Sequence, residues 1–115
     1  MIVRYPDSGL ANIIGQLLEQ KLKEREKMEI AKKMRGKIVL EMKDLNAYAT
    51  LEFKGEVVEA TNDKTENANA SISAKFETFQ KLLSASTLKV IWFIISGKLK
   101  IRGFDLALKF GRLIS

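Results

Sequence analysis

The chain has 115 residues, with 20 lysines and arginines against 14 aspartates and glutamates, and it contains neither histidine nor cysteine. This length corresponds to one compact domain, since domains cluster at ~100–150 residues. Without histidine and cysteine, the side chains cannot build a Ser-His-Asp triad, a thiolate nucleophile, a Cys/His zinc site or a disulfide framework. These absences favour a binding domain over an enzyme.

The overall composition indicates an ordinary globular protein. Apolar residues make up 46% of the chain and charged residues 30%, a balance unlike that of disordered chains. The first residues, MIVRYPDSGL, do not show the cationic start and long apolar run of a secretory signal. Because absent cysteine fits a reducing compartment, we expect a cytoplasmic location.

The net charge of +6 is unevenly distributed along the chain. Residues 1–35 carry a net charge of +3, residues 36–75 carry −2, and residues 76–115 carry +5. A basic C-terminal third favours an anionic partner, either a nucleic acid or a phospholipid surface. An ordinary solvated charged face is the alternative.

Residues 8–35 are predicted to be helical. Asp7 or Ser8 can cap the helix just after Pro6. The apolar residues that follow have the spacing of one buried stripe; they are Leu10, Ile13, Ile14, Leu17, Leu18 and Leu22. The second half, KLKEREKMEIAKKMR, is expected to be a more exposed helix, separate from the first or continuous with it, and Gly36 is expected to end it.

The middle of the chain has the period-2 alternation of strands. KIVLEMK and AYATLEF each place their apolar residues on one side, and short connections predict an antiparallel meander that continues into EVVEA. Residues 61–69, TNDKTENAN, are a polar loop, and ASISA is predicted to be a further strand.

The last third alternates between helices and one strand. KFETFQKLL predicts an amphipathic helix, whereas TLKVIWFIIS is apolar almost all round and ends at Gly97. GKLKIRG alternates, with Leu99 and Ile101 inward and Lys98, Lys100 and Arg102 outward. The final helix, from Phe104, is too apolar for one buried stripe, so part of its surface is expected to meet a partner, a ligand or a membrane.

These elements predict an α+β fold. We expect a single two-layer domain in which a mainly antiparallel sheet of about five strands is covered on one face by helices. The segment Leu88–Ile95, with seven apolar residues in eight, is much shorter than the ~20 residues of a membrane span.

Catalytic and metal sites have little support in the sequence. The carboxylates of the strand region lie mostly on the polar side of their strands, where charges normally face solvent; they are Glu41, Asp44, Glu52, Glu56 and Glu59. No calcium-loop or phosphate-loop spacing occurs. We therefore expect no catalytic residue, no metal site and no cofactor.

Two binding hypotheses remain. A pocket for an acyl chain or sterol needs a continuous apolar lining, which the two highly apolar helices and the apolar side of the sheet would provide. An ordinary dense core is the alternative explanation of the same pattern. Nucleic-acid binding by the basic row Lys98, Lys100 and Arg102 is less favoured, because no aromatic residue alternates with these cations to stack on bases.

Two segments resemble the sterol carrier protein type-2 (sterol-transfer) domain family. ANASISAKFETFQKLLSAS is similar to the family's strand followed by an aromatic-containing helix, and SGKLKIRG with its following apolar helix is similar to the family's near-terminal strand and closing helix. The resemblance covers about residues 37–113. The spacing between Gly103 and Ala107 is about one residue shorter than the family's, and a prokaryotic member is expected.

The resemblance implies a five-stranded sheet and helices that enclose a tunnel for fatty acids, acyl-CoA, sterols or phospholipids, with transfer rather than chemical conversion of the lipid. Carried onto this chain, it implies a tunnel wall at Leu51, Phe53, Leu88, Ile91, Trp92, Ile95, Phe104 and Leu108. The row Lys98, Lys100 and Arg102 is then expected to dock on an anionic membrane surface. A structural or dimerisation module with a filled core, whose last helix packs against a partner chain, is the alternative, and a homodimer is one form of it.

Overall fold

The computed structural model describes residues 1–82 and 92–114. Their strands form one six-stranded sheet in the order β1-β4-β3-β2-β5-β6. The strands are β1 (Ile2–Arg4), β2 (Arg35–Met42), β3 (Ala47–Lys54), β4 (Val57–Thr61), β5 (Ala70–Ala74) and β6 (Leu99–Arg102). The helices are α1 (Leu10–Lys21), α2 (Arg25–Lys33), α3 (Phe76–Leu82) and α5 (Phe104–Ile114), and residues 92–95 are also helical.

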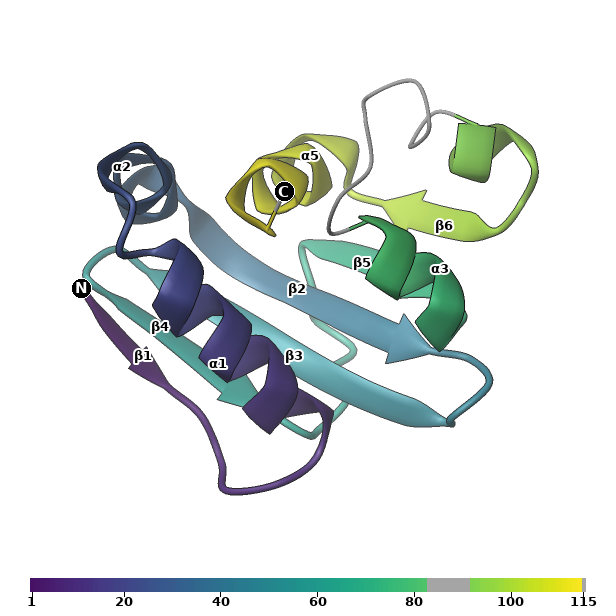
Figure 1. Cartoon of the computed structure of the whole chain (residues 1–115), viewed down its shortest axis with the longest axis horizontal. Coiled ribbons are helices and arrows are strands. Elements are labelled where there is room, and N and C mark those ends of the chain that lie inside the picture. The colour runs from purple at the N-terminus through teal and green to yellow at the C-terminus, as the bar shows by residue number, and fades with distance from the viewer. Residues whose placement is uncertain (83–91, 115) are drawn as a thin grey trace.

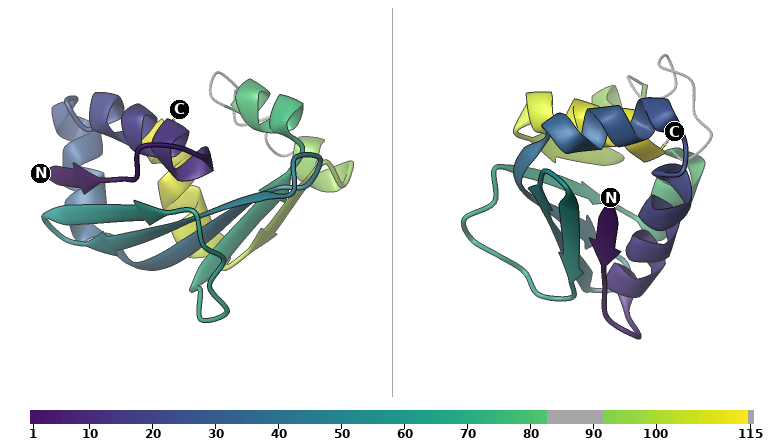
Figure 2. Two further views of the ribbon diagram at one scale, coloured as in Figure 1. Left: turned by 90° about the horizontal axis from the view of Figure 1, so that it is seen from below. Right: turned by 90° about the vertical axis from the view of Figure 1, so that its left-hand side faces the viewer.

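The predicted α+β class is confirmed. The helices lie on one face of the sheet, which we call the core face, and the other face, the open face, carries no helix in the described part of the chain (Figures 1 and 2). β2, β3 and β4 form the predicted antiparallel meander, with β2 in register with β3 from Arg35↔Lys54 to Met42↔Ala47. β5 pairs with β2 in parallel and with β6 antiparallel.

A sixth strand was not foreseen. Residues Ile2–Arg4 form β1, which pairs in parallel with β4 and lies at one edge of the sheet. Three residues are too few to show a period of two. The strand therefore depends on its partner β4 rather than on a local sequence signal.

The predicted start of the first helix was wrong. Its N-cap is Gly9 rather than Asp7 or Ser8, and no side chain at that position makes a capping hydrogen bond. The free N–H of Ala11 instead donates to Oδ1 of Asn62 at 2.8 Å, and Nδ2 of Asn62 donates to the carbonyl of Ser8 at 2.9 Å. A residue from the loop after β4 therefore supplies the cap.

The predicted end of the N-terminal helical segment was also wrong. The segment consists of two helices separated after Lys21, and the second ends at Lys33. Gly36 does not terminate it but lies within β2, with a φ of 122°. An added Cβ there would lie 2.7 Å from the Asn69 side chain. Glycine is therefore needed at this position because the Asn69 side chain comes so close, and it does not end a helix.

Candidate functional site

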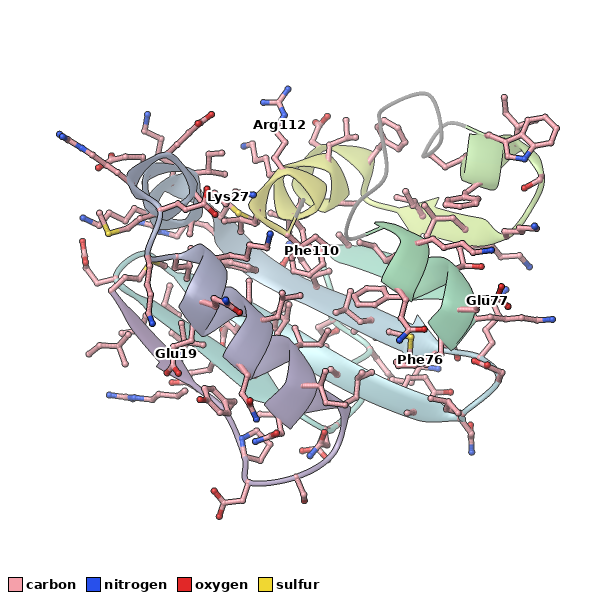
Figure 3. The ribbon with its side chains drawn as sticks, in the orientation of Figure 1. Glu19, Lys27, Phe76, Glu77, Phe110 and Arg112 are labelled. Atoms are coloured by element: carbon pink, nitrogen blue, oxygen red, sulfur yellow. The ribbon has the colours of Figure 1, made fainter. Side chains whose placement is uncertain are left out.

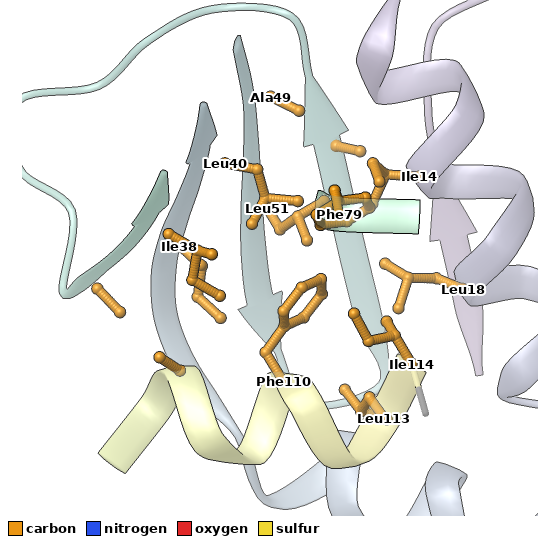
Figure 4. Packing of buried hydrophobic residues seen from close by; sticks show 14 of the residues in the cluster. Ile14, Leu18, Ile38, Leu40, Ala49, Leu51, Phe79, Phe110, Leu113 and Ile114 are labelled. Carbon is orange, nitrogen blue, oxygen red and sulfur yellow. The ribbon is translucent and has the colours of Figure 1, made fainter. Parts of the chain in front are cut away.

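The apolar layer between the core face and the helices is the candidate site. Alternation along β2 and β3 directs one set of side chains into this layer, as predicted. Helix α1 adds Ile14 and Leu18, while α5 adds Phe110, Leu113 and Ile114 (Figure 4). The Phe110 ring points from α5 toward β2 and β3 and has no exposed surface.

The layer is apolar almost throughout. Thr50 and Thr78 are the buried polar residues of the described chain, and neither is charged. Thr50 lies toward the open face, where its hydroxyl donates to the carbonyl of Asp63. An interior without charges or free hydrogen-bonding groups suits a hydrocarbon, which needs neither.

The structure separates the residues that the resemblance assigned to a tunnel wall. Leu51 and Phe53 face the apolar layer and are 0% and 2% exposed. Four others lie on the surface with large exposed fractions: Trp92 61%, Ile95 73%, Phe104 52% and Leu108 44%. Leu88 and Ile91 lie outside the described residues.

The periodicity of α5 explains this separation. Phe104 and Leu108 are four residues apart and share one side of the helix. The buried residues Phe110 and Leu113 occupy the opposite side, and the buried Ala107 lies between the two sides. The core-facing residues of α5 were not assigned to the site from the sequence, although the spacing of Ala107 and Phe110 could have identified the buried stripe.

Two surface hollows of the described chain are lined mainly by polar side chains. One hollow on the open face is lined by Lys37, Thr50, Glu52, Glu59, Thr61, Asp63 and Thr65. Another, beside α2 and the end of α5, is lined mainly by charged residues, with Ile30 among them. Charged linings of this kind do not suit a hydrocarbon, so the apolar layer remains the candidate site.

The carboxylates weighed as catalytic candidates have structural partners. Glu52 and Glu59 lie 3.5 Å and 3.0 Å from Nζ of Lys54. Glu56 lies 3.8 Å from Nζ of Lys32. Oδ1 of Asp44 accepts the backbone N–H of Phe76 at the start of α3. Each of these four carboxylates therefore has a partner within the described part of the chain.

Glu41 belongs to a small polar cluster on the open face. The Ser73 hydroxyl donates to Oε1 of Glu41 at 2.6 Å. This hydrogen bond, together with one from Tyr48, lowers the pKa of the Glu41 carboxyl, and the carboxylate in turn raises the pKa of Tyr48. The ammonium of Lys64 lies 5.2 Å above the Tyr48 ring.

Two further observations concern the described part of the chain. No three acidic side chains there gather closely enough to hold a metal ion. None of its helices combines the length and apolarity that a membrane crossing requires.

The basic row lies at one edge of the sheet. Lys98, Lys100 and Arg102 are all exposed, while Leu99 between them is buried in the apolar layer. β6 is the last strand in the sheet order. The row therefore follows the β6 edge on the side of the open face.

These observations define a class of α+β protein in which helices on one face of a sheet close over an uncharged apolar layer. A model of the SCP-2 sterol transfer family matches residues 14–115. The chain belongs to the SCP-2 sterol transfer family, which supports a lipid-binding or lipid-transfer domain.

Solved structures show the same fold. The "UbiJ-SCP2 Ubiquinone synthesis protein" has a TM-score of 0.74 and 19% identity, over 90% of each chain. The sterol carrier protein domain 2 of Helicoverpa armigera has a TM-score of 0.67 and 22% identity, over 94% of this chain and 87% of that one. Palmitated SCP2L2 from Aedes aegypti has a TM-score of 0.53 and 17% identity, over 83% of this chain and 92% of that one. Comparison with curated protein sequences finds no match.

Proposed function

We infer that this chain is a non-enzymatic lipid carrier that holds a fatty acyl, acyl-CoA or sterol-like ligand between the core face and the helices. The observation that carries the proposal is the uncharged apolar layer, in a chain of the SCP-2 sterol transfer family. A palmitated structure among those that share the fold supports an acyl chain as ligand. A cytoplasmic location is part of the proposal.

The ligand's hydrocarbon is proposed to contact the middle of the sheet. Leu51 and Phe53 of β3 lie there among Ile38, Leu40 and Ala49. Each buried CH₂ of an acyl chain contributes ~0.8 kcal/mol, so a long chain binds without a charged contact. Trp92, Ile95, Phe104 and Leu108 point outward and have a different proposed role, given in the next subsection.

Native mass spectrometry of the purified chain tests the proposal. After mixing with palmitate, palmitoyl-CoA or cholesterol, we expect a one-to-one adduct with at least one of them, and solvent extraction of the untreated protein should release a lipid. Absence of every adduct, in a protein with a cooperative unfolding transition, would contradict the proposal.

A pair of filling variants locates the ligand. Ala49→Leu adds three carbons on the core face, where Ala49 has no exposed surface. Ser71→Leu makes a similar addition to the open face, where Ser71 is half-buried. Ala49→Leu is expected to reduce loading and Ser71→Leu to leave it unchanged. Equal loading by both variants would place the ligand elsewhere.

A further inference from the structure

Exposed apolar side chains are concentrated in one part of the molecule. Seven large hydrophobic residues are exposed in the described chain, and four of them lie between residues 92 and 108. They form two pairs, Trp92 with Ile95 and Phe104 with Leu108. Each pair has the three- or four-residue spacing that puts both side chains on one side of a helix.

The pair on α5 lies away from the sheet. Figure 3 shows Phe110 directed inward from α5 and Arg112 directed outward. Phe104, Leu108 and Gly111 follow one another at the spacing of a single helical line, which adjoins Arg112 on the outward side. An added Cβ at Gly111 would meet no atom within 4 Å, so this line faces open space.

The two pairs flank the same edge strand. β6 leads from the 92–95 segment to the start of α5 (Figure 1). Its four residues span only ~13 Å at the usual rise of a strand. Trp92 and Ile95 therefore stand at one end of the β6 edge, and Phe104 and Leu108 stand at the other.

Cations occur in the same stretch of the chain as these apolar pairs. Lys98, Lys100 and Arg102 follow the open-face side of β6, and Lys109 is exposed on α5. Asp105 is the one acidic residue between 92 and 114. Apolar side chains beside lysines and arginines, with a tryptophan among them, are typical of surfaces that bind at the headgroup level of an anionic bilayer.

We propose that the β6 edge, with Trp92 and Ile95 at one end and Phe104 and Leu108 at the other, docks on an anionic phospholipid bilayer. The four apolar side chains enter the headgroup and acyl boundary, while Lys98, Lys100, Arg102 and Lys109 contact lipid phosphates. This proposal rests on the proposed function, for which it names the surface where ligand is exchanged.

The charges favour a bilayer over the other partners. Two copies of the chain joined symmetrically through this edge would bring Lys98, Lys100 and Lys109 close to their own counterparts, which is unfavourable. A single-stranded nucleic acid would stack on Trp92 and Phe104 but would leave the aliphatic Ile95 and Leu108 without a role.

Vesicle sedimentation tests the apolar contribution. The full chain should bind vesicles of phosphatidylcholine with 30% phosphatidylglycerol, and Phe104→Ser with Leu108→Ser should weaken binding about tenfold or more, since binding scales with the apolar area inserted. The matched control is Ile13→Ser with Leu45→Ser, which removes two residues that are 56% exposed elsewhere. Equal losses in the two double variants would overturn the proposal.

A second series tests the cations. Lys98→Gln with Lys100→Gln should weaken binding to the same vesicles about thirtyfold, because each lysine near an anionic surface adds about 1 kcal/mol. Lys23→Gln with Lys43→Gln removes the same charge from exposed positions elsewhere and should have little effect. Equal binding to vesicles of pure phosphatidylcholine would also contradict the proposal.

A gain-of-binding variant and a loading control complete the test. Gly111→Leu extends the apolar line into open space and should tighten vesicle binding, whereas Gly111→Gln should not. Palmitate loading without vesicles should be the same in the Phe104/Leu108 variant and the parent. If the variant lost palmitate loading but still bound vesicles, these residues would line the ligand instead of docking on the bilayer. If the parent formed a dimer or an oligonucleotide complex that the same variant abolished, the edge would be assigned to that partner.

Discussion

Helices α1 and α5 cover the same sheet face but carry different residues on their outer sides. On α1 the buried stripe is complete, and the outer side carries Gln16, Glu19 and Gln20 with one exposed apolar residue, Ile13. On α5 the buried stripe is equally complete, yet Phe104 and Leu108 remain outside. Packing against the core therefore explains the position of every apolar residue of α1 except Ile13. It does not explain the two large apolar residues on the outer side of α5. The excess apolar surface is the part of α5 available for binding.

The sharpest test of this comparison uses two phenylalanines of one helix. Phe110→Ala should lower the free energy of unfolding by about 3–5 kcal/mol, because it leaves a cavity in the core. Phe104→Ala, at a side chain that is 52% exposed, should lower it by less than about 1 kcal/mol. Urea denaturation measures both values. Similar losses would show that Phe104 contributes to the core and would remove the contrast with α1.

The start of α5 depends on a glycine. Gly103 has a φ of 71°, and an added Cβ would lie 2.2 Å from the carbonyl oxygen of Asn69. Gly103→Ala should therefore cost about 2–4 kcal/mol, from the left-handed backbone and the clash together. Gly111→Ala, which meets no atom within 4 Å, should stabilise the helix by about 0.5–1 kcal/mol. Thermal unfolding of the two variants should shift in opposite directions.

The start of α1 depends on a distant side chain. Asn62→Ala removes the hydrogen bonds to Ala11 and Ser8 and should cost about 1 kcal/mol, the usual value of a lost N-cap. Asn67→Ala in the same loop is the control and should stay within about 0.5 kcal/mol of the parent. If the two variants unfold at the same denaturant concentration, α1 does not need the cap from the loop.

The smallest expected effect lies on the open face, which neither helix covers. Ser73→Ala removes the hydroxyl that donates to Glu41, so the pKa of Glu41 should rise toward its ordinary value of 4.5. Carbon-13 NMR titration of the carboxyl measures this shift, with Ser71→Ala as control. A pKa of Glu41 that did not move would exclude the Ser73 hydrogen bond as its main cause.

The same substitution has a consequence for stability. A lowered pKa in the folded state contributes stability above pH 4.5, and this is lost as the pH falls through the lowered value. The variant should therefore be less stable than the parent near neutrality, by under about 1 kcal/mol for so accessible a group, and equally stable in strong acid. A difference that persisted in acid would point to another cause.

Local patterns predicted much of the fold. The stripe of α1 and the meander of β2, β3 and β4 follow from periods of 3.6 and 2 that each segment carries by itself. Three features depend on residues distant in the chain and have no local signal. These are β1, the cap by Asn62 and the position of Gly36 inside β2. The sequence pattern could not assign them because their partners come from other elements.

The candidate site was predictable to the same extent. Alternation along β3 indicated that Leu51 and Phe53 face the core, and both lie in the apolar layer. The 92–95 segment is apolar on every side, so its sequence could not show which side would be covered, and only tertiary packing determines that Phe93 is buried while Trp92 is exposed. In α5 the charged residues Asp105, Lys109 and Arg112 share one side, so the spacing of Ala107 and Phe110 did carry a signal for the buried stripe.

The central position of β2 has a consequence for folding kinetics. Its neighbour β3 follows through a short turn, whereas its parallel neighbour β5 comes only after β4 and a polar loop. Because long loops must close before distant strands can pair, the β2–β3 hairpin is expected to form first and the β5–β6 ribbon later. Until then β2 is an unpaired edge that carries Ile38, Leu40 and Met42, and such edges join between molecules. Refolding yield should therefore fall as protein concentration rises.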